Sequence, residues 1–330
     1  MKIKLNSRNA IASLFIALGL VLSACSGAGV DEGASTDTSG STTEETATEA
    51  VAAECGEWNI AMHAWVGYTA GAQVLSNVGE ELGCTINQVK LDEAGVTYDA
   101  IEAGSIDVIV EDWGGGRWQE WADRGQLVEV GENGNVGLIG MFVPAWMAEE
   151  YPDITDAANL NKYAELFETS ESGGKGAWYE GPPGYTTIGE KMIAAGDLNF
   201  QVISTGSEAA LVELFTQAVE NKTAALGYFY EPHNLFGALD LVRINWPEND
   251  WSAPEEADGS TDYPKSPLIK IASKNLIDSG DPFATLFQNW TWTNADQNQI
   301  AADIESGTDP EVAAQKWIDE NRATVDGWLG

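Results

Sequence analysis

Large aromatic side chains stand at the ends of four predicted strands, where they could bind a positively charged ligand. These residues are Trp65, Trp113, Trp178 with its neighbour Tyr179, and Tyr230. In open parallel sheets, ligands bind beyond the carboxyl ends of the strands. We therefore expect these rings to converge on one cleft and to form an aromatic box.

An aromatic box suits a quaternary ammonium ion. Such an ion has no N–H group, so hydrogen bonds cannot hold its charge, whereas each ring face attracts it by roughly 0.5–2 kcal/mol. Sugars also stack on tryptophan, but a sugar site would add many Asn, Asp and Arg side chains for the hydroxyl groups. The predicted strand ends carry acids and few clustered amides, which favours the ammonium ligand.

Further candidate ligand contacts lie close to these strand ends: Tyr68, Asp112, Glu180, Tyr185 and His233. His233 fits either a ligand contact or the start of a helix behind Tyr230, and both interpretations stay open. His63 is interpreted as structural. With 2 histidines and no Cys/His cluster in the sequence, we expect no transition-metal site and no cofactor.

The elements that would position these residues alternate between strand and helix. The first set has strands at 58–65, 85–91 and 107–112, with helices at 70–81 and 96–103. Such alternation indicates βαβ units with a parallel sheet. The second set has a strand that ends at Trp178 and further elements at 159–167, 186–195, 200–205, 207–222 and 224–230.

Two crossings between these sets are expected. Residues 127–147 read as two strand-like runs around a Gly-Asn turn, and the chain is expected to return within 240–270. The tail reads as helices at 282–289, 294–305, 309–320 and 321–329. The sequence thus predicts an α/β clamshell with a hinged cleft, in which residues 55–145 and 250–330 form one lobe and residues 146–249 the other.

The N-terminus predicts export. A basic start, an apolar run at 10–22 and small residues before Cys25 make residues 1–24 a signal peptide. The Leu-Ser-Ala-Cys tetrad at 22–25 resembles the lipobox of bacterial lipoproteins, which implies a lipid on Cys25. An ordinary signal peptide is the alternative. Residues 26–54 are small, polar and acidic, so they would be a disordered tether.

Charge and cysteines narrow the function further. The net charge of −36, from 52 acidic and 16 basic residues, disfavours nucleic acid as a partner and leaves the lipid as the only expected membrane contact. Cys55 and Cys84 precede neighbouring predicted strands. In an exported protein these two cysteines are predicted to form a disulfide.

Residues 57–329 resemble the glycine betaine and choline solute-binding proteins of ABC importers. The resemblance rests on the order and spacing of several segments: Trp65, residues 104–108, Glu111-Asp112-Trp113, Val143-Pro144, Gly-Pro-Pro-Gly at 181–184, residues 205–210, Tyr230-Glu231-Pro232-His233, residues 313–318 and Trp328-Leu329. It implies a type II periplasmic-binding-protein-like fold, an ABC permease and ATPase as partners, and a position outside the cytoplasm, on the outer face of the membrane. A monomer is expected.

The resemblance also implies roles for individual residues. Trp65, Trp113 and Tyr230 match the aromatic cage, and residues 178–180 match the backbone that binds a ligand carboxylate. This chain departs from the family at Gly114-Gly115-Gly116, where Arg117 follows and would replace a carboxylate-binding histidine. The departure leaves two ligands open, a betaine-like zwitterion and a cation without a carboxylate, such as choline.

Other functions are less favoured. A ligand sensor for a membrane receptor would have the same fold and differ only in its partner. A lipid-tethered hydrolase is disfavoured because the sequence has neither a Walker-type phosphate loop nor a Gly-x-Ser-x-Gly nucleophile elbow. The sequence therefore predicts a binding protein and not an enzyme.

Overall fold

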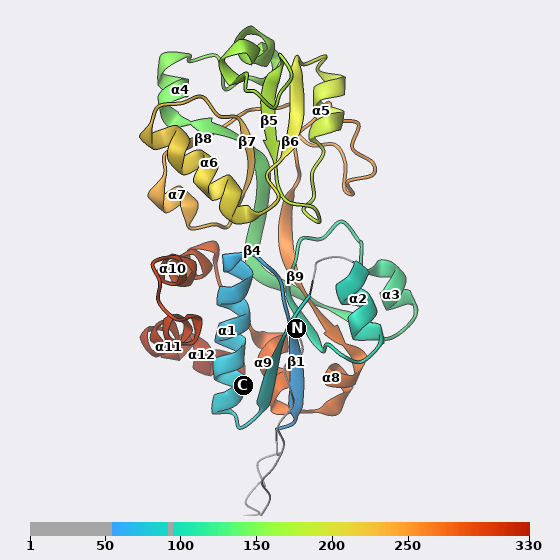
Figure 1. The fold of residues 1–330 in the computed structure, drawn as a ribbon. Helices are drawn as coiled ribbons and strands as arrows, with labels where there is room; N and C mark the ends of the chain where they lie inside the picture. The colour runs from blue at the N-terminus through green and yellow to red at the C-terminus, as the bar shows by residue number, and fades with distance from the viewer. Residues whose placement is uncertain (1–54, 92–94) are drawn as a thin grey trace, which may run out of the picture. The chain divides into compact units, whose positions relative to one another are not determined.

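The computed structural model describes residues 55–91 and 95–330 (Figure 1). The predictions on residues 1–54, which concern the signal peptide, Cys25 and the tether, lie outside this part of the chain. The described residues belong to one compact unit. Within them, every helix is too short or too polar to cross a lipid bilayer.

Among the described residues, nine strands form one mixed sheet. Their order is β2-β1-β3-β9-β4-β7-β5-β6, and β8 pairs with β4 outside this path. The strands are β1 (Glu57–Met62), β2 (Thr85–Lys90), β3 (Val108–Asp112), β4 (Leu127–Pro144), β5 (Gly176–Glu180), β6 (Phe200–Ser204), β7 (Gly227–Glu231), β8 (Leu241–Arg243) and β9 (Lys265–Ser273).

Parallel pairs at the two ends of this sheet define two α/β lobes. The first lobe has β1 parallel to β2 and β3, and the second has β5 parallel to β6 and β7. Strands β4 and β9 are antiparallel to each other and connect the lobes (Figure 1). The predicted fold, a two-lobed α/β sheet with flanking helices, is confirmed, and the chain returns on β9 within the expected region.

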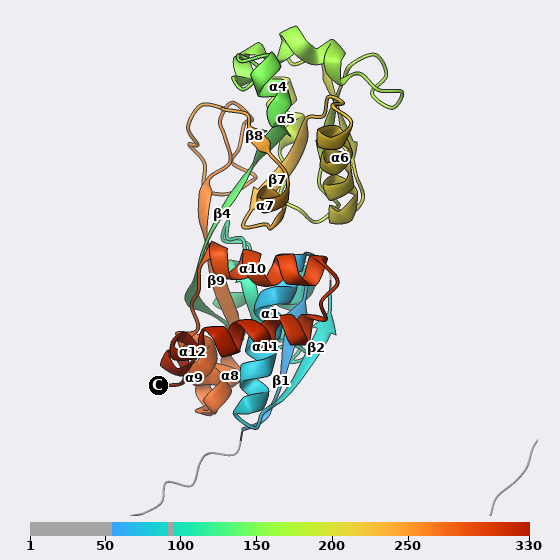
Figure 2. The ribbon, with the colours of Figure 1, turned by 90° about the vertical axis from the view of Figure 1, so that its left-hand side faces the viewer.

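Helices flank the sheet in both lobes, and α10 and α11 pack on α1 (Figure 2). The first lobe contains α1 (Val66–Glu81), α2 (Gly95–Glu102), α3 (Gln119–Asp123), α8 (Lys274–Ser279), α9 (Pro282–Asn289), α10 (Asn294–Glu305), α11 (Pro310–Glu320) and α12 (Arg322–Leu329). The second contains α4 (Ala145–Glu150), the 3₁₀ helix η1 (Ala157–Phe167), α5 (Gly189–Ala195), α6 (Glu208–Glu220) and α7 (Leu235–Ala238).

The predicted turn within residues 127–147 is wrong, because β4 runs through it without reversing. The register between β4 and β9 shifts at two places, between Glu129 and Gly131 and between Glu132 and Val136. Within the second irregularity, the Asn133 amide donates to the Val110 carbonyl and accepts from the Asn135 N–H. Side-chain hydrogen bonds thus replace the lost ladder bonds, and the strand continues.

Two strand ends also differ from the prediction. Strand β1 ends at Met62, so Trp65 does not end the strand but is the N-cap residue of α1. Strand β5 continues to Glu180, which places Trp178 in its middle. Side chains alternate between the faces of a strand, so a shift in the strand end changes which residues can face the cleft.

Cys55 and Cys84 precede the paired strands β1 and β2, as predicted. Glu57 pairs with Thr85 at this edge of the sheet, and the two cysteine Cα atoms lie 4.6 Å apart with the Sγ atoms at bonding distance. Asp281 accepts hydrogen bonds from the backbone N–H groups of Gly56 and Phe283 at 2.7 and 2.8 Å. The start of the described chain is thereby tied to the N-terminus of α9.

Candidate functional site

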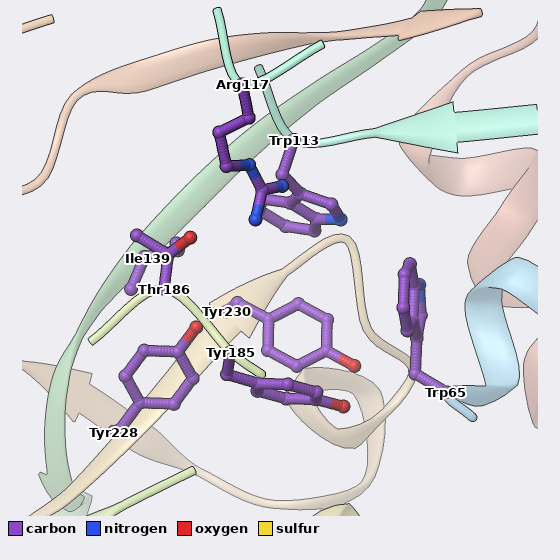
Figure 3. A pocket seen from close by; sticks show the side chains of 8 residues that line it. All are labelled: Trp65, Trp113, Arg117, Ile139, Tyr185, Thr186, Tyr228 and Tyr230. Carbon is purple, nitrogen blue, oxygen red and sulfur yellow. The ribbon is translucent and has the colours of Figure 1, made fainter. Parts of the chain in front are cut away.

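A pocket of about 320 Å³, its open mouth included, lies where the two lobes face each other. Trp65, Trp113 and Arg117 come from the first lobe, and β4 supplies the floor (Figure 3). Eight residues line the pocket: Trp65, Trp113, Arg117, Ile139, Tyr185, Thr186, Tyr228 and Tyr230. The pocket wall is therefore mostly aromatic.

Four of these rings contact one another edge to face. Trp113 meets Tyr230 at 5.3 Å between ring centroids and 88° between planes, and Trp65 meets Tyr185 at 6.4 Å and 84°. Tyr185 and Tyr230 lie 5.9 Å apart at 79°. Perpendicular neighbours are a favoured aromatic geometry. They also turn ring faces in several directions around one space, as a compact cation requires.

The indole of Trp113 fits into the pocket wall because a neighbouring residue leaves room for it. The residue follows β3, and its ring lies against Gly137 on β4. A Cβ atom on Gly137 would come within 2.6 Å of the Trp113 ring. The glycine in the crossing strand therefore allows an indole from the first lobe to reach the floor of the pocket.

Glu111 joins the two tryptophans. Its Oε1 atom accepts hydrogen bonds from Nε1 of Trp65 and Nε1 of Trp113, each at 3.0 Å. The side chain is buried. Burial raises the pKa of Glu111 to about 7, although hydrogen bonds from both indoles, Gln297 and Asn135 act in the opposite direction. The carboxyl group therefore fixes both rings and changes its charge near neutral pH.

Trp65 is supported from behind by a second aromatic layer. Tyr68 meets it edge on at 5.0 Å, and His63 lies 5.2 Å from it. The Tyr68 hydroxyl accepts the backbone N–H of Val110 at 3.2 Å. Burial, together with the positive charge of Arg117, lowers the pKa of His63 to about 4, so the imidazole is neutral at physiological pH. Tyr68 and His63 thus pack behind the indole.

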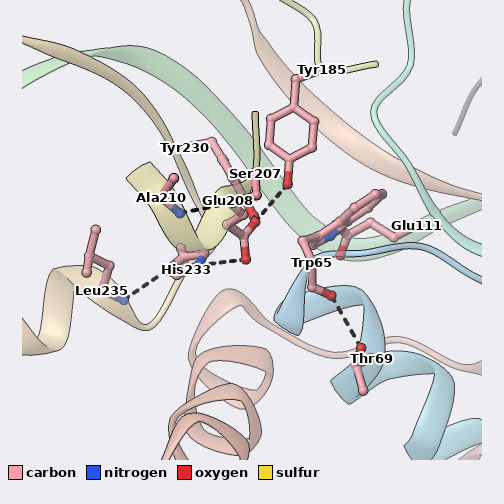
Figure 4. A network of polar contacts seen from close by, with 10 residues as sticks. All are labelled: Trp65, Thr69, Glu111, Tyr185, Ser207, Glu208, Ala210, Tyr230, His233 and Leu235. Carbon is pink, nitrogen blue, oxygen red and sulfur yellow. Dashed lines mark hydrogen bonds and ion pairs between the residues drawn. The ribbon is translucent and has the colours of Figure 1, made fainter. Parts of the chain in front are cut away.

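Glu208 joins the two tyrosines on the opposite wall. Its Oε2 atom accepts hydrogen bonds from the hydroxyl groups of Tyr185, at 2.8 Å, and Tyr230 (Figure 4). His233 lies 3.4 Å from the other carboxylate oxygen. Glu208 is the first residue of α6, after the Ser207 N-cap. The four rings are therefore held in two pairs, each by one carboxyl group.

The structure brings five of the predicted ligand contacts into the pocket and leaves six outside its lining. The five are Trp65, Trp113, Arg117, Tyr185 and Tyr230. Asp112 lies behind them, where its carboxylate accepts from the Tyr98 hydroxyl and the Gly114 N–H. Tyr68 and His233 also lie behind the rings, as described above.

The strand residues 178–180 are the other three outside the lining. Trp178 is fully buried and packs on Phe200 and Trp246 at 6.1 and 5.8 Å between ring centroids. Glu180 accepts the backbone N–H of Gly189 at 2.7 Å, at the start of α5. Tyr179 pairs in register with Ile203 of β6. These residues build the second lobe.

Three lining residues, Ile139, Thr186 and Tyr228, are additional to the predicted set. Tyr228 lies two residues before Tyr230 on β7, and residues two apart share one face of a strand. That alternation is a signal from which Tyr228 could have been predicted. Ile139 belongs to β4, and its position depends on the unbroken course of that strand.

Comparison with known proteins identifies the family. Residues 57–320 match the substrate binding domain of ABC-type glycine betaine transport systems. The chain is 27% identical over 279 residues to the trimethylamine N-oxide-binding protein of Pelagibacter ubique (strain HTCC1062), which covers 80% of this chain and 88% of that protein.

Solved structures share the fold. Lactococcal OpuAC in complex with glycine betaine superposes with a TM-score of 0.64 at 19% identity, over 83% of this chain and all of that one. An ABC-transporter choline binding protein in complex with choline gives 0.66 at 20% identity, over 83% and 92% of the two chains. Both likenesses support the type II fold. With the match over residues 57–320, the chain belongs to the family of substrate-binding domains of ABC-type glycine betaine transport systems.

Proposed function

We propose that this protein binds a small methylated ammonium solute, such as glycine betaine, in its aromatic pocket and delivers the solute to an ABC importer. One observation carries the proposal. Four aromatic rings from both lobes surround one space at steep angles, and each pair of rings is held by a carboxyl group. The family to which the chain belongs supports the transport role.

The chemistry of the pocket agrees with a trimethylammonium group. Methyl groups fill an apolar, ring-lined space, and the spread positive charge is attracted to the ring faces by roughly 0.5–2 kcal/mol per ring. Related proteins are named for trimethylamine N-oxide, glycine betaine and choline. These three compounds share three methyl groups on one nitrogen.

Arg117 decides between the two ligand types. It lines the pocket beside Trp113 (Figure 3) and is suited to bind the carboxylate of a betaine-like zwitterion. Glu111 and Glu208, in contrast, add negative charge that suits a cation such as choline. Replacement of Arg117 by Gln should weaken binding of glycine betaine and leave choline binding unchanged or stronger. The opposite selectivity would contradict this role for Arg117.

The wider transport role completes the proposal. A lipid on Cys25 and the tether at 26–54 would hold the protein on the outer face of the membrane. One lobe would comprise residues 55–145 and 250–330, and the other would comprise residues 146–249. Strands β4 and β9 would form the hinge between them. Metabolic labelling with a radioactive fatty acid should mark the wild-type protein and not the Cys25→Ala variant. Equal labelling of both would exclude Cys25 as the lipid site, and no labelling of either would exclude the anchor.

Calorimetry with single ring variants tests the pocket. Replacement of Trp65, Trp113 or Tyr230 by Ala should each weaken ligand binding by roughly two- to thirtyfold, since each removes one ring face from the cation. Trp146→Ala is the matched control, because that indole lies on α4 and donates to the Ala218 carbonyl. Unchanged affinity in all three pocket variants would exclude the aromatic box.

A further inference from the structure

Glu208 makes a set of contacts that reaches both tyrosines of the pocket from behind. Tyr185 comes from the loop after β5 and Tyr230 from β7, yet both hydroxyl groups donate to the same atom, Glu208 Oε2 (Figure 4). The side chain of Glu208 is only 13% exposed. One carboxyl group therefore sets the orientation of two rings that belong to separate elements.

This carboxyl group is held in its ionised form. The Nδ1 atom of His233 accepts the backbone N–H of Leu235 at 3.0 Å, so the ring proton lies on Nε2 and points to Glu208 Oε1. Burial alone would raise the pKa of Glu208, but the hydrogen bonds from His233, Tyr230 and Tyr185 outweigh it and lower the pKa. The N-terminus of α6 adds partial positive charge at the same place.

An ionised acceptor increases the attraction of the two tyrosine rings for a cation. A phenol that donates its proton toward an anion carries more electron density in its ring than a phenol bonded to a neutral acceptor. The attraction between a ring face and a cation is electrostatic, so it grows with that density. Salt also screens the charge of Glu208 only weakly, because most of the side chain is covered.

We propose that Glu208 is a positioning residue that sets the specificity of the pocket for positively charged ligands over neutral ligands of the same shape. It acts through Tyr185 and Tyr230, whose rings it orients and makes more negative. The inference rests on the proposed function and deepens it, since it assigns the preference for positive charge to a residue outside the pocket lining.

Pairs of ligands that differ only in charge test this role. Choline, a cation, and 3,3-dimethylbutan-1-ol, which is neutral, have the same shape, with nitrogen in one and carbon in the other. Glycine betaine, a zwitterion, and 3,3-dimethylbutanoate, an anion, form a second pair. The Glu208→Gln variant keeps a hydrogen-bond acceptor but loses the charge. It should bind choline and glycine betaine several-fold more weakly than the wild type, the neutral 3,3-dimethylbutan-1-ol equally well, and the anion 3,3-dimethylbutanoate equally well or better.

Glu213→Gln is the matched control, because Glu213 is an exposed acid on the same helix whose carboxylate accepts from Gln217. This variant should leave both affinities unchanged. Tyr185→Phe and Tyr230→Phe remove the hydroxyl groups that donate to Glu208. They test the same contact by themselves, even in the case that Glu208→Gln does not fold. Each should weaken ammonium binding in the wild type and have a smaller effect in a Glu208→Gln background, as coupled residues do.

The outcomes separate the two proposals. A wild-type protein that binds none of the ammonium ligands would overturn the proposed function and this inference with it. A wild type that binds an ammonium ligand, with the same charge preference in Glu208→Gln and in both phenylalanine variants, would overturn only the role of Glu208. Equal losses for charged and neutral ligands would also overturn it, because a merely structural role predicts that result.

Discussion

At the scale of single residues, the two acids that hold the rings on opposite walls of the pocket have their pKa values shifted in opposite directions. Glu111 receives its hydrogen bonds from indole and amide groups, and burial raises its pKa to about 7. Glu208 has a histidine and a helix N-terminus beside it, and its pKa is lowered. A rise in pH through about 7 therefore ionises Glu111 on one wall, whereas Glu208 on the other wall is already negative.

Ligand binding should follow the ionisation of Glu111. The affinity for tetramethylammonium should rise as pH increases through about 7, because a carboxylate behind Trp65 and Trp113 favours a cation more than a carboxylic acid does. Titration calorimetry between about pH 5.5 and 8.5 measures the step. The Glu111→Gln variant should lose the pH step, and a step of unchanged size in that variant would assign it to another group.

The stability of the fold should change in the opposite direction. The pKa of Glu111 is raised from 4.5 to about 7 in the folded state, so the folded protein holds this proton more tightly than the unfolded chain. The contribution to the free energy of unfolding is fully present below pH 4.5 and is lost as pH rises through about 7. The loss is roughly 3 kcal/mol, measurable as the difference in urea unfolding between wild type and Glu111→Gln at pH 5 and pH 8.

The sequence indicated the rings and placed acids near the cleft, but it did not show which acids hold which rings. Trp113 and Tyr230 could be predicted because each stands at the end of a strand whose length follows from its own residues. Trp178 stands in a similar pattern, but β5 extends past it and the indole enters the core. The role of Glu208 depends on two tyrosines that only the folded chain brings to it.

At the scale of elements, β4 shows that pairing with a distant strand can override the turn preference of the local sequence. Gly131, Asn133 and Gly134 are typical turn residues, and they predicted a reversal. Strand β9, more than a hundred residues later, pairs with β4 on both sides of this segment. In between, the buried Asn133 side chain accepts the backbone N–H of Asn135 and donates to the carbonyl of Val110. The sequence therefore predicted where the chain crosses between the lobes, but not that it crosses as one uninterrupted strand.

Substitution in this irregular segment should be costly at one glycine and milder at another. Gly134 has φ = 95°, and an added Cβ would lie 2.1 Å from the backbone oxygen of Trp292. Gly131 has φ = 120° and open space around the same position. Gly131→Ala should cost about 1–2 kcal/mol from the backbone conformation alone, and Gly134→Ala clearly more. Equal midpoints in urea unfolding would contradict this difference.

The pairing of β1 with β2 places Cys55 and Cys84 together, and a disulfide between them should stabilise the first lobe. A bond between residues separated by 29 positions should contribute roughly 3–4 kcal/mol, if it acts by restricting the unfolded chain. The double variant Cys55→Ser/Cys84→Ser should unfold at correspondingly lower urea concentration. A thiol assay on denatured, unreduced protein should find neither cysteine free; two titrating thiols from these positions would show that the bond does not form.

At the scale of the whole molecule, charge and pocket act together on ligand capture. The chain carries a net charge of −36, and a strongly charged protein attracts ligands of opposite sign over a distance that salt shortens, from about 30 Å at 0.01 M to about 8 Å at 0.15 M. The pocket adds Arg117 in its lining, and Glu111 and Glu208 behind its rings. We therefore expect capture of a cation to be faster than its contacts alone would allow.

Salt should slow the association of choline and leave that of its neutral counterpart unchanged. Stopped-flow tryptophan fluorescence is suited to the measurement, because Trp65 and Trp113 line the pocket. The association rate constant of choline should fall several-fold between about 20 and 500 mM NaCl, because the field that draws the cation is screened. 3,3-Dimethylbutan-1-ol has the same shape without the charge, so any salt effect on lobe closure would change its rate equally. If both rates fell alike, salt would be acting on the conformation of the protein and not on the approach of the ligand.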